Sequence, residues 1–181
     1  MRIKPRNTQA WMVDIQERLL PVMSRPEHLM ERTEILLKGL RLLEVPVVVS
    51  QQYTKGLGMT DRRLLAAAGT ESYLEKISFS CLGETGMREQ LKSDPERVNG
   101  LVFGIETHIC VLQTVLDLKE AGYQPVVVAD CLDSRNPFDR EIALRRMEEE
   151  GARLTTVEAC LFELTERAGT DVFRQISRLI K

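Results

Sequence analysis

The sequence lacks the segments that would direct a chain to or through a membrane. Its first residues, MRIKPRNTQAW, contain no apolar stretch of the kind found in signal peptides. No run reaches the roughly 18 consecutive apolar residues that a membrane-spanning helix needs. We therefore expect a cytoplasmic protein without membrane contacts.

Cysteine and histidine are scarce, and their spacing predicts neither a disulfide framework nor a zinc site. There are four cysteines and two histidines, and no two cysteines form a CxxC pair. In a reducing compartment we expect free thiols, most of them packed as small apolar side chains. The sequence therefore predicts no metal and no cofactor.

An excess of charge of one sign is also missing. The chain has 25 Lys and Arg against 27 Asp and Glu, a formal net charge of −2, and no basic stripe. This argues against nucleic acid as the main partner. With 43% hydrophobic residues and no repeats or linkers, residues 1–181 are expected to form one globular domain with a sizeable core.

What the sequence does contain is an alternation of short apolar runs and helical patterns. Such alternation is typical of a parallel sheet covered by helices on both faces. Right-handed crossovers then favour a doubly wound α/β/α sandwich of three layers with a mostly parallel, six-stranded sheet. Strands are predicted at 9–16, 45–52, 72–80, 99–105, 124–130 and 152–159, and helices at 27–44, 83–94, 107–122 and 136–151, with two more after residue 160.

Reactive side chains in such folds lie just after the carboxyl ends of the strands, near the switch in strand order. Several polar residues meet this condition. They are Asp14 after the first strand, Gln51 and Gln52 after the second, residues 106–110 after the fourth and residues 130–136 after the fifth.

Cys110 lies in the predicted first turn of its helix. Unpaired amides and the positive end of the helix dipole favour a thiolate there, and can lower the thiol pKa from its usual value of roughly 8.5. A packed, unreactive thiol is the other interpretation. His108 is the obvious base, but two residues on a helix are about 200° apart, so the two side chains point away from each other. His108 is therefore interpreted as a polar residue near a helix start.

A carboxylate is an alternative base. Asp14 follows the buried run WMV, where an unpaired charge is costly. It is either a cap or a base that takes the proton of Cys110, with a pKa raised by apolar walls. Lys76 interrupts the semi-apolar segment YLEKISFS. It either extends to the surface or balances charge beside the thiol.

Together these residues resemble the isochorismatase-like cysteine hydrolases, a superfamily that includes nicotinamidases and N-carbamoylsarcosine amidohydrolase. The resemblance covers roughly residues 8–165 and is most specific in GIETHICVLQT; it includes QQYTKGLG and VVVADCLDSRNPFDREIAL. It implies a triad in which Cys110 attacks a carbonyl and Asp14 acts first as base and then as acid for the leaving amine. Lys76 would orient Asp14 and lower the thiol pKa.

The resemblance also implies a cis peptide bond between Ile105 and Glu106. The amides of Glu106 and Cys110 would then form an oxyanion hole. Nicotinamidases bind a metal through an aspartate and histidines after the second strand, whereas this chain has SQQYTKGLG and is expected to have no metal site. Isochorismatases have another residue at the nucleophile position and cleave a vinyl ether, so Cys110 argues against that reaction. The YTKGLG loop resembles that of an uncharacterised branch of the family.

The leading hypothesis is a metal-free hydrolase that cleaves a C–N bond of a small amide through a thioester on Cys110. The alternative is a small-molecule-binding or assembly protein without turnover on the same fold. A dinucleotide-binding domain is disfavoured because no GxGxxG follows a strand. A homo-oligomer is expected from the resemblance. Position alone suggests six substrate-binding residues: Ile15, Gln16, Tyr53, Phe79, Asn136 and Phe138.

Overall fold

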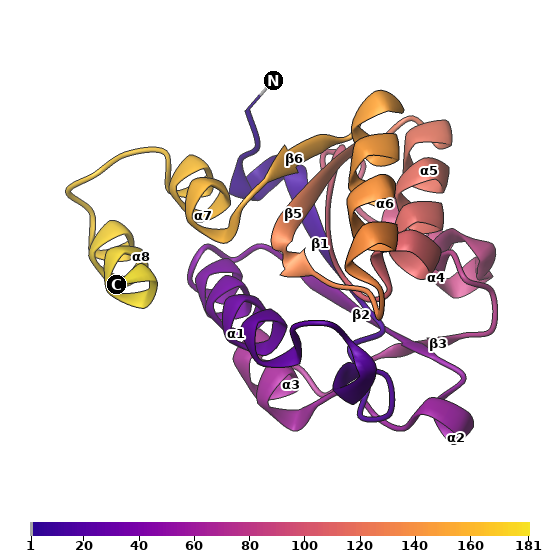
Figure 1. Cartoon of the computed structure of the whole chain (residues 1–181). Helices are drawn as coiled ribbons and strands as arrows, with labels where there is room; N and C mark the ends of the chain where they lie inside the picture. The colour runs from indigo at the N-terminus through magenta and orange to yellow at the C-terminus, as the bar shows by residue number, and fades with distance from the viewer. Residues whose placement is uncertain (1) are drawn as a thin grey trace.

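The computed structural model describes residues 2–181 as a six-stranded parallel sheet between two layers of helices (Figure 1). The strands run in the order β3-β2-β1-β4-β5-β6, and every neighbouring pair is parallel. Their bounds are β1 (Thr8–Val13), β2 (Val47–Gln52), β3 (Leu74–Lys76), β4 (Asn99–Gly104), β5 (Gln124–Leu132) and β6 (Arg153–Thr155). This confirms the predicted α/β fold class.

The helices divide into two groups, one on each face of the sheet (Figure 1). One face is covered by α1 (Pro26–Leu42), α3 (Arg62–Ala68), α7 (Val157–Thr165) and α8 (Asp171–Ile180). The other is covered by α4 (Thr85–Lys92), α5 (Leu112–Glu120) and α6 (Pro137–Glu149). The short helix α2 (Thr54–Leu57) follows β2 at the edge of the sheet. None of the helices in residues 2–181 is long and apolar enough to cross a bilayer.

The two central strands are apolar throughout because both of their faces are buried. Every residue of β1 and β4 is buried. Successive side chains of a strand point to opposite faces. Accordingly, Met12 packs into the core beneath α1, and Trp11 and Val13 pack into the core beneath α5. This explains why these strands appear in the sequence as continuous apolar runs.

Two predicted strands are shorter in the structure. Only Leu74–Lys76 of the segment 72–80 is a strand, because the chain then turns so that its carbonyl groups face Lys76. Only Arg153–Thr155 of the segment 152–159 is a strand, because Thr156 caps α7 through its side chain. The predicted helix at 107–122 begins with a π-helical turn, Thr107–Val111, before α5 starts.

The ends of β1 and β4 approach each other very closely at Gly104. A Cβ atom at this position would lie 2.1 Å from the carbonyl oxygen of Val13, and the φ angle is +128°. Only glycine fits a site with both constraints. This close approach sets Asp14, which follows β1, beside the turn that carries Cys110.

Candidate active site

Asp14 is the first residue after β1 and lies wholly inside the protein. Its backbone adopts a left-handed conformation, with a φ angle of 52°. Oδ1 accepts a hydrogen bond of 2.7 Å from Ser50 Oγ. Oδ2 lies 2.7 Å from Lys76 Nζ, yet receives no well-aligned hydrogen bond from residues 2–181. One oxygen of the carboxylate is thus held by Ser50, and the other by the ion pair with Lys76.

Lys76 ends β3, and its ammonium group is surrounded by oxygen atoms. Besides Asp14, Nζ contacts Gln52 Oε1 at 2.6 Å, Phe79 O at 2.8 Å and Ser78 O at 3.2 Å. Burial, the largest single effect, lowers the pKa of Lys76, but Asp14, Cys110 and Cys81 together raise it by more, and the net shift is upward. Lys76 therefore remains a cation that balances the buried carboxylate.

Cys110 lies in the π-helical turn and is 7% exposed. Burial, followed by the negative charge of Asp14, raises the pKa of its thiol to about 12, although Lys76 acts in the opposite direction. The expectation of a lowered pKa is therefore wrong, because desolvation exceeds the effects of the helix end and of Lys76. At rest this residue is a thiol close to the carboxylate of Asp14.

The peptide bond between Ile105 and Glu106 is cis, as the resemblance implied. Glu106 is buried, and among residues 2–181 its backbone N–H finds no protein acceptor. A buried N–H without a partner is rare in folded proteins. This amide, four residues before Cys110, is therefore free to donate to a bound ligand.

Three of the residues suggested for substrate binding are exposed aromatic side chains at the same edge of the sheet. Tyr53 follows β2 and donates its N–H to Lys76 O, and Phe79 accepts from Lys76 Nζ through its carbonyl group. Phe138 lies in the first turn of α6, next to Asp139, whose carboxylate is 3.9 Å from His108 Nε2. Their residue exposures are 49%, 54% and 64%, respectively.

The other three suggested residues have structural contacts. Ile15 is fully buried in the core. Gln16 is also fully buried, and its amide bonds Gln52 N, Gln52 O and Gly58 O. The side chain of Asn136 accepts a hydrogen bond of 3.0 Å from Phe138 N and caps α6. Ile15 and Gln16 have no exposed surface in this structure, whereas Asn136 is exposed.

His108 does not serve Cys110 in this structure. Its Nδ1 lies 3.0 Å from Ser134 Oγ, and its Nε2 faces α6. These contacts agree with the interpretation that His108 is a polar residue near a helix start.

The family model described as an isochorismatase domain matches residues 11–159. The chain belongs to the isochorismatase family. A secreted isochorismatase effector, Isc1, of Phytophthora sojae is 36% identical over 99% of this chain and 87% of its own length. Human isochorismatase domain-containing protein 2 is also 36% identical, over 99% of this chain and 86% of its own.

Two solved structures share the isochorismatase-family fold over 99% of this chain. One is titled MAR1 ribonuclease from Caenorhabditis elegans; it has a TM-score of 0.92, is 34% identical, and is covered over 92% of its length. The other, the YcaC protein of Escherichia coli, is titled an octameric hydrolase of unknown specificity; it has a TM-score of 0.92, is 21% identical, and is covered over 89%. At that identity, the second likeness concerns the fold alone.

Ser50 and Gln52 contribute to the candidate site of this family member but were not predicted as site residues. Ser50 bonds Asp14, and Gln52 bonds Lys76. Gln52 lies at the end of a predicted strand, and this position was the feature of the sequence that could have indicated it. Ser50 lies within strand β2. Selection of residues that follow strand ends therefore did not include it.

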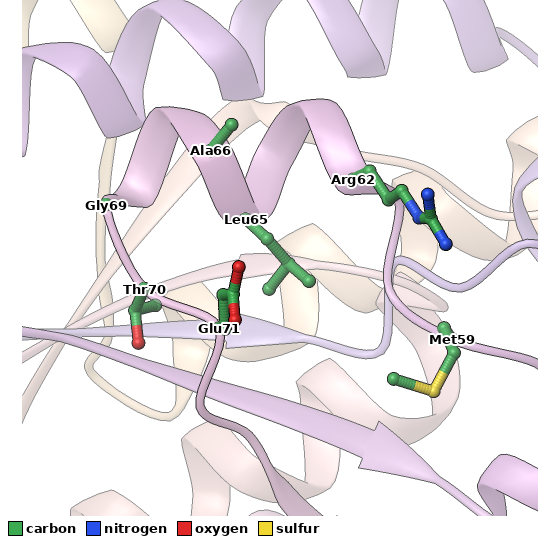
Figure 2. Close-up of a pocket in the computed structure, with 7 residues that line it drawn as sticks. All are labelled: Met59, Arg62, Leu65, Ala66, Gly69, Thr70 and Glu71. Carbon is green, nitrogen blue, oxygen red and sulfur yellow. The ribbon is translucent and has the colours of Figure 1, made fainter.

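A separate surface hollow of about 660 Å³ lies beside α3 and contains no residue of the candidate site. Figure 2 shows that its lining comes from α3 and the adjoining chain on either side of that helix. The residues are Met59, Arg62, Leu65, Ala66, Gly69, Thr70 and Glu71. The hollow is therefore separate from the candidate active site of this family member.

Proposed function

We propose that this isochorismatase-family protein is a cysteine hydrolase that cleaves a C–N bond of a small amide through a thioester. The observation that carries the proposal is the buried ion pair of 2.7 Å between Asp14 and Lys76, both of whose side chains are 0% exposed, beside the thiol of Cys110. Two buried charges are expensive to maintain. Their position next to a slightly exposed thiol supports a chemical role.

In the first half of the proposed reaction, Cys110 Sγ forms a bond to the amide carbon. Asp14 takes the thiol proton as this bond forms, so no free thiolate is needed at rest. The carbonyl oxygen gains negative charge and accepts a hydrogen bond from the N–H of Glu106, and from that of Cys110. Asp14 then protonates the leaving nitrogen, the C–N bond breaks, and a thioester remains.

In the second half, water attacks the thioester carbon and Asp14 accepts the proton of that water. The C–S bond breaks, Cys110 recovers its proton from Asp14, and a carboxylic acid leaves. Lys76 keeps its charge throughout, because its contacts with Asp14, Gln52 and two carbonyl groups favour the ammonium form. The apolar side chains of Tyr53, Phe79 and Phe138 would contact the substrate.

The proposal is tested by an ammonia-release screen over small aliphatic and aromatic primary amides. We expect turnover in the unaltered protein and a loss of at least about 1,000-fold in Cys110→Ala. Cys160→Ala is the matched control, because Cys160 is a buried thiol in α7, under the opposite face of the sheet. Turnover that survives in Cys110→Ala would refute the nucleophile assignment.

The same screen addresses the alternatives. A binding or assembly protein without turnover would release ammonia from no amide. Short single-stranded RNA is included because one similar structure is titled a ribonuclease, although the charge of −2 does not favour a phosphate backbone as ligand. Cleavage of RNA without amide turnover would contradict the proposal.

We further propose that the chain is a single-domain, cytoplasmic homo-oligomer without cofactor. The four unpaired cysteines support a reducing compartment. Ile77 and Val22, 67% and 53% exposed, are apolar side chains that a second copy would cover. Light scattering coupled to size-exclusion chromatography measures the mass directly, and a value of 20.6 kDa would exclude the oligomer.

A further inference from the structure

The side chain of Glu106 is held by a residue from the neighbouring strand connection. Its side chain is 7% exposed, and Oε2 accepts two hydrogen bonds of 3.1 Å, from Arg135 N and from Arg135 Nε. Arg135 lies between β5 and α6, and its own side chain is 60% exposed. Arg135 therefore binds Glu106 through both its backbone N–H and its side chain. In the proposed mechanism, Glu106 is the residue whose backbone N–H donates to the substrate oxygen.

The next residue is fixed to the same connection. Thr107 donates both its N–H, at 2.9 Å, and its hydroxyl, at 2.8 Å, to Asp133 O. Asp133 is itself anchored, because its carboxylate accepts bonds from Ser24 Oγ and from Ser134 N. The contacts of Arg135 and Asp133 together position residues 106 and 107 against the chain that follows β5.

The contact with Arg135 affects the charge at Glu106 as well as its position. A nearly buried carboxylate attached to the residue that supplies an oxyanion donor opposes the build-up of negative charge on the substrate oxygen. The guanidinium of Arg135 offsets that charge. The two donors of Arg135, its backbone N–H and its Nε, also fix the position of the carboxylate oxygen that accepts from both.

We propose that Arg135 is a positioning residue of the oxyanion hole, which holds Glu106 in place and neutralises its carboxylate. The inference rests on the proposed role of Cys110 as nucleophile. It predicts that Arg135 matters for acyl transfer, in which an oxyanion forms, and not for alkylation, in which none does.

Two reagents separate these cases on the full-length protein. p-Nitrophenyl acetate acylates Cys110 with release of p-nitrophenolate and passes through an oxyanion; iodoacetamide displaces iodide and does not. In Arg135→Ala we expect acylation about 10-fold slower and alkylation within about twofold of the unaltered rate. Arg145→Ala is the matched control, because Arg145 forms an exposed ion pair with Glu141 on α6.

The double variant Glu106→Gln/Arg135→Ala gives the sharper test. An uncharged amide at residue 106 needs no counter-charge, so acylation is expected to recover to within about threefold of Glu106→Gln alone. Equal slowing of both reactions, unchanged acylation in Arg135→Ala, or no recovery in the double variant would each overturn the inference. The proposed function fails differently: intact mass would then find no acetyl group on Cys110 of the unaltered protein.

Discussion

The carboxylate of Asp14 affects the thiol of Cys110 in two opposite ways. Its negative charge is, after burial, the main reason why the pKa of Cys110 rises to about 12. In the proposed reaction the same carboxylate accepts the thiol proton. The two effects are compatible if the proton moves while the carbon–sulfur bond forms, as in general-base catalysis, and not before.

Replacing Asp14 by Asn is therefore expected to separate thiol acidity from turnover. Removal of the negative charge lowers the pKa of Cys110, so alkylation by iodoacetamide should reach its half-maximal rate at a lower pH. Amide turnover should be lost, because the base is gone. The rate of alkylation at fixed pH between about 7 and 9 is followed by intact mass and should be higher in Asp14→Asn than in the unaltered protein; Asp117→Asn, at a half-buried position of α5, is the control. An unchanged or lower rate in the Asp14→Asn variant would contradict the role given to this charge.

Strand-end position and the family resemblance together predicted Asp14, Lys76 and Cys110 as residues of the candidate site, but not the residues that contact them. Asp14 and Cys110 stood out because a charge and a thiol follow buried strands, and Lys76 because a charge interrupts an apolar segment. The pKa of Cys110 was mispredicted because a helix start indicates a dipole, whereas desolvation depends on the residues packed above it. Arg135 lies in the segment 130–136 that follows a predicted strand, but nothing in its local sequence indicates a contact with Glu106.

Gln16 connects the end of β1 to the loop after β2. Its amide makes three hydrogen bonds, of 2.7 to 3.0 Å, to the backbones of Gln52 and Gly58. Gln52 in turn bonds Lys76. The conformation of this loop depends on Gln16, a wholly buried residue, and the contact of Gln52 with the ammonium group of Lys76 depends on the loop.

Truncation of Gln16 to Ala is expected to lower the free energy of unfolding by about 2–4 kcal/mol. The reason is that buried backbone groups lose their partners, which costs more than the net value of each hydrogen bond. Urea denaturation measures the change. Gln113→Ala, at an exposed position of α5, serves as control and should remain within about 0.5 kcal/mol of the unaltered protein. If both variants unfold at the same urea concentration, the loop does not depend on Gln16.

The elements that the sequence predicted well are those whose residues are buried on both sides. The apolar runs at 9–16, 45–52, 99–105 and 124–130 correspond to the long strands β1, β2, β4 and β5. The edge strands β3 and β6 were overestimated, because their lengths depend on a buried lysine and on a helix cap. Strand order beyond a doubly wound pattern was not predicted, since apolar runs carry no information about pairing.

All four thiols of the protein are buried, and each has a raised pKa. For Cys81, burial is the main cause, and the pKa rises from its ordinary value of 9.0 to about 11. The folded protein consequently keeps these protons at a pH where the unfolded chain has released them. Stability from this source is complete below about pH 9 and is lost as the pH rises through the folded-state values.

The molecule should therefore unfold more easily in mild alkali. Between about pH 9 and 10.5 each thiol contributes a slope of up to about 1.4 kcal/mol per pH unit. Urea titrations at several pH values give the total slope, and Cys160→Ala should reduce it by about the share of one thiol. A free energy of unfolding that is flat over this range, or a slope unchanged in the Cys160→Ala variant, would show that the thiols do not control it.

The order of the strands also determines at which point during synthesis the candidate site can be complete. β1 pairs on one side with β2 and on the other with β4, which begins only at Asn99. A ribosome therefore releases Asp14 and Lys76 well before Cys110, and the edge of β1 stays open until β4 has emerged. A chain arrested between β3 and β4 contains both charges but not Cys110, so the candidate site is complete only when the strand that leads into it has joined the centre of the sheet.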